Sequence, residues 1–392
     1  MDNYCILPFN SVSINATGEI RQCCNAGKQT NIFADKDDIL NSKYMREMRR
    51  VFASDKRHSD CNRCWKMEDH GTKSFRHYAN NNPEYGIQGR KLNLKGKLKP
   101  TDIEYIDITL GNKCNLACRM CNPYSSSLLG QQLSELGIYN GPIDVGLNEK
   151  QKEAVLKLFE QAVNLKAVYM LGGEPLINPL HDELLQLMID NGSSKNISLH
   201  YNTNLQVNKL DKYLDKWNQF KKIDLQASID GSHEVYNYIR WPGNWDKVYK
   251  NLYSIVDNAD PNKFFISITS TLQNINAVNV LDLIDECSYI DNKPVPFFFI
   301  PVVGTMTLDI TPKHILKDCI ERIKAYKKII GPIDDLYGNY VKAYESEVSK
   351  KQAVRFFNEM KMFDQKRNQN LFDTIPFMIE VAEEHGINTW QL

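Results

Sequence analysis

Three cysteines in one short segment have the types and the spacing needed to bind a metal cluster. Cys114, Cys118 and Cys121 are separated by three and then two residues, directly after a run that is typical of a β-strand. Thiolates are the ligands that iron–sulfur clusters take. Three of them on one loop can hold three irons of a cubane and leave the fourth iron open to bind and activate another molecule.

Two simpler interpretations of these cysteines are a zinc site and unrelated core residues. Zinc normally takes a fourth protein ligand nearby, and the next His or Cys after Cys121 is His181. The spacing therefore favours an open iron–sulfur cluster over both.

The N-terminal segment carries a second set of cysteines: Cys5, the adjacent pair Cys23 and Cys24, and then Cys61 and Cys64. Four thiolates can close a second cubane with one cysteine at each iron. They can equally form a tetrahedral zinc site. The spacing alone does not decide between these two metals.

The elements that must position these residues follow from hydrophobic periodicity. Alternation predicts a small hairpin over residues 9–14 and 19–22, and helical spacing predicts a helix over residues 39–52. Six strand-like runs then alternate with amphipathic helical stretches, which argues for parallel strands with right-handed crossovers. These runs are Glu104–Leu110, Lys166–Leu171, Ile197–Asn202, Lys222–Ile229, Phe264–Leu272 and Pro294–Val303. Helices are expected over residues 315–330, 353–363 and 371–382.

Polar and glycine residues follow several of these strands, where parallel barrels place their chemistry. Gly172, Gly173, Glu174 and Pro175 come after the second strand, Asn204 after the third, and Ser228 and Asp230 at the end of the fourth. Glycines allow close backbone approach, and a carboxylate can bind an ammonium group. Each of these sets is also compatible with an ordinary turn, and Arg240 with a surface residue.

The pattern Cys114-x3-Cys118-x2-Cys121 resembles the signature of the radical S-adenosylmethionine (radical SAM) superfamily. The resemblance implies that the open iron chelates S-adenosylmethionine, whose reductive cleavage gives a 5′-deoxyadenosyl radical that removes a substrate hydrogen. Gly172-Gly173-Glu174-Pro175 is similar to the family's GGEP motif, which contacts the amino group of S-adenosylmethionine. The stretch ending at Arg240 resembles one whose arginine lies near the carboxylate of that molecule.

The N-terminal cysteines resemble the auxiliary-cluster module called SPASM, or its shortened form, twitch. The similarity implies a second 4Fe–4S cluster on Cys5, Cys23, Cys61 and Cys64. Aligned on Gly18, the second family ligand falls on Cys23, which leaves Cys24 as a spare or alternative ligand. The module usually follows the radical SAM core, and here it precedes it.

The expected fold class is α/β, with a partial (β/α)6 TIM-like barrel. The expected domains are a small α+β cysteine-rich module over residues 1–95, the barrel over residues 101–303, and a helical C-terminal extension over residues 304–392 that covers the barrel.

Composition narrows the class of function further. Lys plus Arg and Asp plus Glu both number 48, so no global field attracts nucleic acid or an anionic membrane. The first residues lead us to expect no secretory signal, and no apolar run approaches the roughly 20 residues that span a bilayer. Ten cysteines in a cytoplasmic-type sequence indicate metal or redox chemistry rather than disulfides.

The sequence therefore predicts a cytoplasmic radical SAM enzyme that oxidatively modifies a peptide or protein, with an electron donor such as flavodoxin or ferredoxin. One alternative is a small-molecule radical SAM dehydrogenase, and another is a non-catalytic, zinc-stabilised interaction protein. The sequence assigns no catalytic residue and does not identify the substrate.

Overall fold

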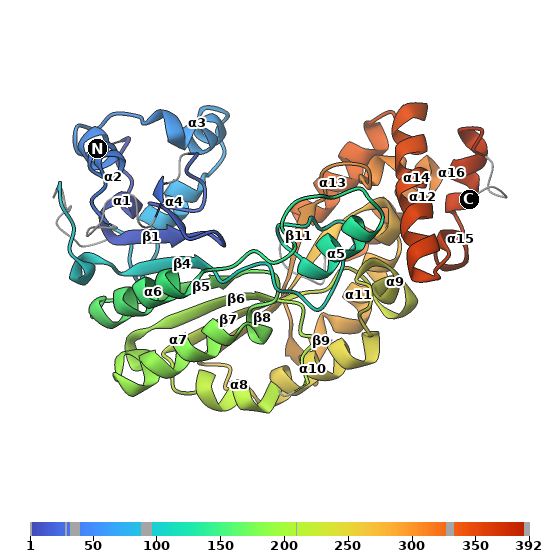
Figure 1. The fold of residues 1–392 in the computed structure, drawn as a ribbon. Coiled ribbons are helices and arrows are strands. Elements are labelled where there is room, and N and C mark those ends of the chain that lie inside the picture. Colours follow the sequence, from blue (N-terminus) through green and yellow to red (C-terminus); the bar gives the residue numbers. More distant parts are fainter. Residues whose placement is uncertain are drawn as a thin grey trace.

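A long, mostly parallel β-sheet runs through the computed structural model (Figure 1). The structure describes residues 2–27, 30–31, 40–87, 96–208, 210–326 and 333–387. Within these ranges nine strands form one sheet in the order β11-β8-β7-β6-β5-β4-β1-β2-β3. The α/β class expected from the sequence is therefore confirmed.

Six parallel strands form the part of the sheet that was expected to be the barrel. They are β4 (Tyr105–Thr109), β5 (Ala167–Leu171), β6 (Ser198–Thr203), β7 (Lys222–Ser228), β8 (Phe264–Leu272) and β11 (Phe297–Pro301). Their order follows the chain, as in a partial barrel. The last strand is shorter than predicted, because Lys293–Pro294 forms β10 and pairs with β9 (Tyr289–Ile290) instead.

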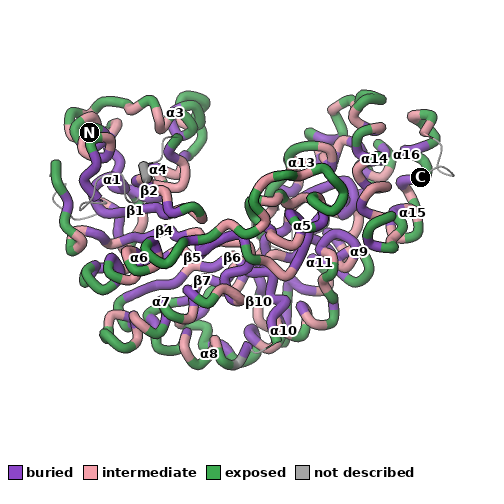
Figure 2. The backbone as a smooth tube through the Cα atoms, viewed as in Figure 1, coloured by how far each residue is buried: buried purple, intermediate pink, exposed green. Residues whose placement is uncertain are grey.

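Helices cover one face of this sheet and bury the largest core of the protein (Figures 1 and 2). They include α6 (Glu149–Gln161), α7 (Pro179–Asp190), α8 (Leu210–Trp217), α10 (Trp245–Asn258) and α11 (Asn279–Cys287). The shorter α5 (Ser127–Glu135) and α9 (His233–Ile239) lie nearer the ends of the strands. Alternate residues of β7, such as Ile223 and Leu225, are buried against the helices, which explains the periodicity of the sequence.

The N-terminal residues extend the sheet at its β4 edge. Strand β1 (Ser11–Ile14) pairs in parallel with β4, with Ile14 opposite Ile108, and antiparallel with β2 (Glu19–Arg21). A third strand, β3 (Thr30–Asn31), completes the sheet. The helices here are α1 (Leu7–Asn10), α2 (Lys43–Ala53), α3 (Asn62–Asp69) and α4 (Phe75–Asn80).

Two predicted elements of the N-terminal residues have different bounds in the structure. The prediction of a strand from Phe9 is wrong at its start, because Leu7–Asn10, with Pro8 in its first turn, forms the short helix α1 and the strand begins only at Ser11. The predicted helix over 39–52 corresponds to α2, but residue 39 and the predicted module boundary at residue 95 lie outside the described residues.

The C-terminal residues fold into helices that pack beside the barrel (Figure 1). They are α12 (Lys313–Tyr326), α13 (Asp334–Glu345), α14 (Lys350–Arg367), α15 (Leu371–Thr374) and α16 (Met378–Glu384). The prediction of one helix over 371–382 is wrong, because Pro376 separates α15 from α16. Helix α13 was not predicted, and its interior Gly338 weakens the helical signal. Residues 327–330 of the first predicted helix lie outside the described residues.

Candidate functional site

The three-cysteine loop follows β4 and lies at the carboxyl ends of the barrel strands. Its backbone is held against the segment that follows α9: the Ala117 amide donates to the Trp241 carbonyl at 2.7 Å, and the Arg119 amide to the Ile239 carbonyl at 2.9 Å. The Ser126 hydroxyl also donates to the Leu116 carbonyl at 2.6 Å. The first two contacts fix the loop against the end of α9, which is distant in sequence.

Burial acts on all three thiols of the loop, and repulsion by another cysteine acts on Cys114 and Cys118. Burial raises the pKa of Cys114 to about 12, with Glu174 and Cys121 adding to the shift. Burial also raises the pKa of Cys118, where Cys121 and Cys114 contribute, and that of Cys121. Desolvated thiols resist ionisation, and binding of the thiolates to a cationic iron–sulfur core would relieve that cost. The set therefore fits an iron–sulfur cluster.

Two residues expected to bind the cofactor contact the cysteines directly. The Asn204 side-chain amide lies 3.8 Å from Cys114 Sγ, and Arg240 Nη1 lies 3.8 Å from Cys118 Sγ. Asn204 is itself held by Asn115 of the loop, whose Oδ1 accepts from its amide at 2.9 Å. The end of the third barrel strand and the residue after α9 thus meet at the loop.

Glu174 lies buried next to the loop. Its Oε1 accepts from the Thr203 hydroxyl at 2.7 Å and from the Leu176 amide at 3.1 Å, and its Oε2 accepts from the Asn204 amide at 2.7 Å. Burial raises the pKa of Glu174 to about 7, against the opposing effect of these donors. A desolvated carboxylate with spare acceptor capacity is suited to an ammonium group.

Gly172 and Gly173 serve a backbone contact that the sequence analysis did not anticipate. The Gly173 amide donates to the Gly111 carbonyl, and the Glu174 amide to the Lys113 carbonyl. A Cβ atom on Gly173 would lie 2.4 Å from the Lys113 carbonyl oxygen. The glycines thus let this turn, which continues into Pro175, pack against the cysteine loop.

A buried ion pair joins two further predicted residues. Arg240 Nε lies 2.7 Å from Asp230 Oδ2, and the Asp230 side chain is 0% exposed. Asp230 Oδ1 accepts from the Thr271 amide at 2.7 Å. The half-buried Ser228 ends β7 two residues earlier. Asp230 thereby aims Arg240 at the cysteine loop.

The N-terminal cysteines form a second group. Cys5 is buried and interacts electrostatically with Cys23, Cys61 and Cys64, and these interactions, after burial itself, raise its pKa. Burial and Cys61 raise the pKa of Cys23 to about 12. Cys5 and its neighbours pack in one apolar cluster with aromatic side chains of β4 and β5.

Cys24 differs from its neighbour Cys23. Its thiol is hydrogen-bonded to Asp107 of β4, a carboxylate whose pKa burial raises to about 6. The largest charged influence on Cys23 is instead Cys61. The two adjacent cysteines thus have different surroundings, one at the cysteine group and the other at the sheet.

The described residues contain no group of three or more His, Cys, Asp or Glu side chains arranged to hold a single metal ion. A cubane has a different requirement, because it takes one thiolate at each of several irons and its ligands do not converge on one point. No helix within the described ranges is long and apolar enough to cross a membrane.

Sequence reasoning missed the residues of α14 that contact the loop. Arg119, between Cys118 and Met120, forms an ion pair with Asp364 at 2.5 Å and stacks on the Tyr238 ring at 3.6 Å. Arg367 Nη2 donates to the Ala117 carbonyl at 2.7 Å. Only the position of Arg119 inside the cysteine motif could have drawn attention to it.

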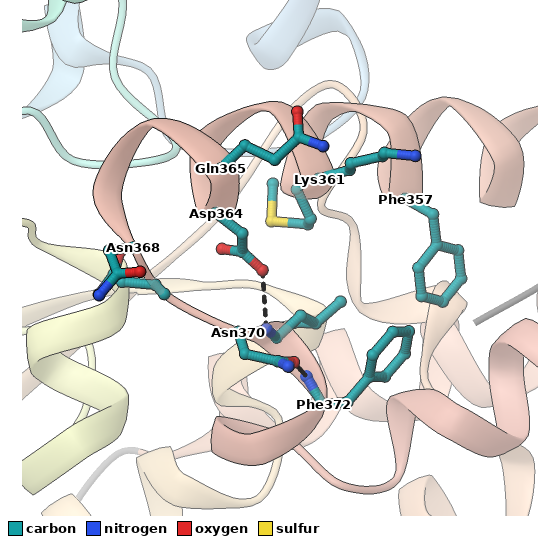
Figure 3. Close-up of a pocket in the computed structure, with 10 residues that line it drawn as sticks. Phe357, Lys361, Asp364, Gln365, Asn368, Asn370 and Phe372 are labelled. Carbon is teal, nitrogen blue, oxygen red and sulfur yellow. Dashed lines mark hydrogen bonds between the residues drawn. The ribbon is translucent and has the colours of Figure 1, made fainter. Parts of the chain in front are cut away.

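A cavity of about 240 Å³ lies beside this contact, between α14 and α15. Figure 3 shows Asp364 with its carboxylate pointing toward the start of α15, where it accepts from the Leu371 amide at 2.7 Å. Asn368 and Asn370 line the same space. The carboxylate that holds Arg119 is therefore reached from this cavity.

Comparison with solved structures finds matches at low sequence identity and with TM-scores below 0.5. The protein anSMEcpe with bound AdoMet is 17% identical over 60% of this chain and 62% of its own, with a TM-score of 0.42. Streptococcus suis SuiB bound to S-adenosylmethionine is 19% identical over 57% of this chain and 47% of its own, with a TM-score of 0.39. The chain thus spans less than two thirds of either protein. A comparison with curated proteins finds no match.

The Radical SAM superfamily model matches residues 108–285. The matched region begins in β4 and ends in α11, and it contains the cysteine loop, Glu174, Asp230 and Arg240. Proteins of this superfamily are enzymes that use a 4Fe–4S cluster and S-adenosylmethionine. Residues 108–285, which are less than half of the chain, are thus similar to a radical SAM domain.

Proposed function

We propose that the protein is a radical SAM enzyme that oxidatively modifies a peptide or protein substrate, with help from an auxiliary 4Fe–4S cluster in its N-terminal residues. The observation that carries the proposal is the convergence of Glu174, Asn204 and Arg240 on the three-cysteine loop at the ends of the barrel strands. Bound together, the loop's cluster and S-adenosylmethionine supply a 5′-deoxyadenosyl radical that removes a substrate hydrogen atom.

The residues of the site would have separate roles in binding the cluster and S-adenosylmethionine. Cys114, Cys118 and Cys121 hold the cluster. Glu174 would accept a hydrogen bond from the ammonium group of S-adenosylmethionine. Arg240, which Asp230 orients, would face the carboxylate of that molecule. Gly172, Gly173 and Pro175 keep the Glu174 turn against the loop, while Asn204 and Ser228 offer hydrogen bonds at the strand ends.

A cluster in the N-terminal residues would accept the second electron of a two-electron oxidation. Removing a hydrogen atom leaves a substrate radical, and loss of one more electron and a proton completes a two-electron oxidation. Cys5, Cys23, Cys61 and Cys64 would hold a cluster able to accept that electron, and an external donor such as flavodoxin or ferredoxin would supply the first one. Cys23 interacts electrostatically with Cys5, Cys61 and Cys64, which supports Cys23, rather than Cys24, as the fourth ligand of this cluster.

A peptide substrate is the favoured class because the N-terminal cysteines resemble modules of peptide-modifying enzymes. Two proteins of similar fold are also described with peptides: anSMEcpe with the Cp18Cys peptide and SuiB with the precursor peptide SuiA. A small-molecule dehydrogenase remains the second candidate.

The first test is iron content and Mössbauer spectroscopy on anaerobically reconstituted protein, compared with a variant in which Cys114, Cys118 and Cys121 are all alanine. About eight irons per chain falling to about four is expected for two cubanes. A fall from about four to none makes the N-terminal group a zinc or structural site. Reduced wild type is expected to form 5′-deoxyadenosine from S-adenosylmethionine, and the triple variant is not. No iron after reconstitution would refute the enzyme assignment.

A further inference from the structure

Helix α14 places a second buried arginine against the cysteine loop. Arg367 is 6% exposed, and its Nη2 donates to the Ala117 carbonyl at 2.7 Å, one residue before Cys118. The same nitrogen donates to Gln132 Oε1 at 3.0 Å. The guanidinium also lies 4.2 Å from the centre of the Phe363 ring.

In the part of the chain that the structure describes, Arg367 has no carboxylate of its own, since the one that acts on it electrostatically, Asp364, is already paired with Arg119. Within the described residues Arg367 forms no ion pair, whereas Arg119 is paired with Asp364 and Arg240 with Asp230. Its Nη1 is buried without a hydrogen-bond partner. Burial, together with the nearby Arg119, lowers the pKa of Arg367 to about 9, so the side chain stays charged at neutral pH.

A buried cation without a counterion is costly unless an anion lies nearby. Cys118 acts on Arg367 electrostatically. A cubane held by three thiolates carries a net negative charge, which reduction increases. The potentials of such clusters depend on net charge, hydrogen bonds and solvent exposure. A cluster in this loop is therefore the counterion that Arg367 lacks.

We propose that Arg367 is a positioning residue that holds the cysteine loop through Ala117, and that its unpaired charge raises the reduction potential of the cluster in that loop. The proposal rests on the proposed function, because it requires the cluster. It makes helix α14 part of the redox site rather than only a cover over the barrel.

The test is an EPR-monitored redox titration of reconstituted protein, following the cluster signal that changes when S-adenosylmethionine is added. Arg367→Gln is expected to lower the ratio of reduced to oxidised cluster about tenfold at a fixed potential, which is ~59 mV for a one-electron couple. Arg367→Lys keeps the charge, so its ratio of reduced to oxidised cluster at that potential is expected to stay within about twofold of the wild-type ratio.

Lys366→Gln is the matched control. It removes the same charge from the adjacent residue of α14, but the Lys366 side chain is 33% exposed and paired with Glu135. At the same fixed potential, its ratio of reduced to oxidised cluster is therefore expected to stay within about twofold of the wild-type ratio. An unchanged potential in Arg367→Gln, or an equal shift in Lys366→Gln, overturns the proposal.

Loss of the cluster in Arg367→Gln leaves the decision to Arg367→Lys. A cluster with the wild-type potential in that variant supports the role of charge, whereas loss of the cluster there as well leaves only the guanidinium contact with Ala117 and overturns the role proposed for charge. If the wild type itself binds no iron at this loop, the proposed function fails instead, which keeps the two failures distinct.

Discussion

Replacing Asp230 by Asn is expected to destabilise the protein far more than the same change at an exposed ion pair. Asp230 is fully buried, and its Oδ2 lies 2.7 Å from Arg240 Nε. Asparagine keeps the shape and the acceptor for the Thr271 amide, but it removes the charge that compensates Arg240. Removing one partner of a buried ion pair costs about 3–5 kcal/mol, because the other charge stays buried.

The matched control is Asp182→Asn. Asp182 is likewise a paired aspartate: its carboxylate lies 3.0 Å from Lys212 Nζ and 2.7 Å from Lys216 Nζ. Unlike Asp230, however, its side chain is 37% exposed. Pairs of this kind contribute about 0–1 kcal/mol. The two identical substitutions should therefore differ by at least about 2 kcal/mol, a factor of roughly 30 in the unfolding equilibrium constant.

The assay is urea unfolding of reconstituted wild type and variants, followed by tryptophan fluorescence, together with S-adenosylmethionine binding by equilibrium dialysis. Asp230→Asn should also weaken binding at least tenfold, since Arg240 loses the carboxylate that aims it at Cys118 (~1.4 kcal/mol per tenfold). Adding Arg240→Met should restore much of the lost stability but not the binding, because no charge is then left buried. Equal losses of stability in the two Asp→Asn variants would refute the reasoning.

Three further predictions follow from single contacts. Burial lowers the pKa of His181 to about 3, so the folded state resists protonation that the unfolded state accepts below about 6.5. Stability should be complete above about pH 6.5 and fall by up to ~1.4 kcal/mol per pH unit as the pH drops toward 3, and His181→Phe should flatten that slope in unfolding curves measured between pH 5 and 7.5. Gly173→Ala should cost the loop cluster its iron, because the new Cβ would meet the Lys113 carbonyl oxygen at 2.4 Å, and retained iron would contradict the close packing. Cys23→Ser should lower iron content by about four per chain, whereas Cys24→Ser should keep it, and the reverse result would exchange the two assignments.

The strands of the barrel were predictable because each has a local signal. Alternate residues of β7 are buried on the helix side, and β8 has the bounds expected from its apolar run. The cysteine loop was predictable for a related reason: Cys114, Cys118 and Cys121 lie within eight residues, so their spacing carries the chemistry.

The contacts that complete the site were not predictable because they join distant segments. Arg119 and Asp364 are 245 positions apart, and Arg367 and Ala117 are 250 apart. No periodicity in α14 distinguishes Asp364 or Arg367 from the other charged residues of that helix. The different surroundings of Cys23 and Cys24 likewise depend on Asp107, which belongs to another strand.

The N-terminal residues extend the sheet at the edge where the chain enters the first barrel strand, β4. Consecutive elements tend to be neighbours, and a chain that enters the barrel at β4 most easily adds its earlier strand beside β4. Strand β1 does so, which brings Cys24 to Asp107. The same strand, β4, ends just before Gly111 and the cysteine loop. At about 3.3 Å per residue, roughly 13 Å of backbone separates Asp107 from Gly111. Strand β4 therefore links Cys24, through Asp107, to the start of the cysteine loop.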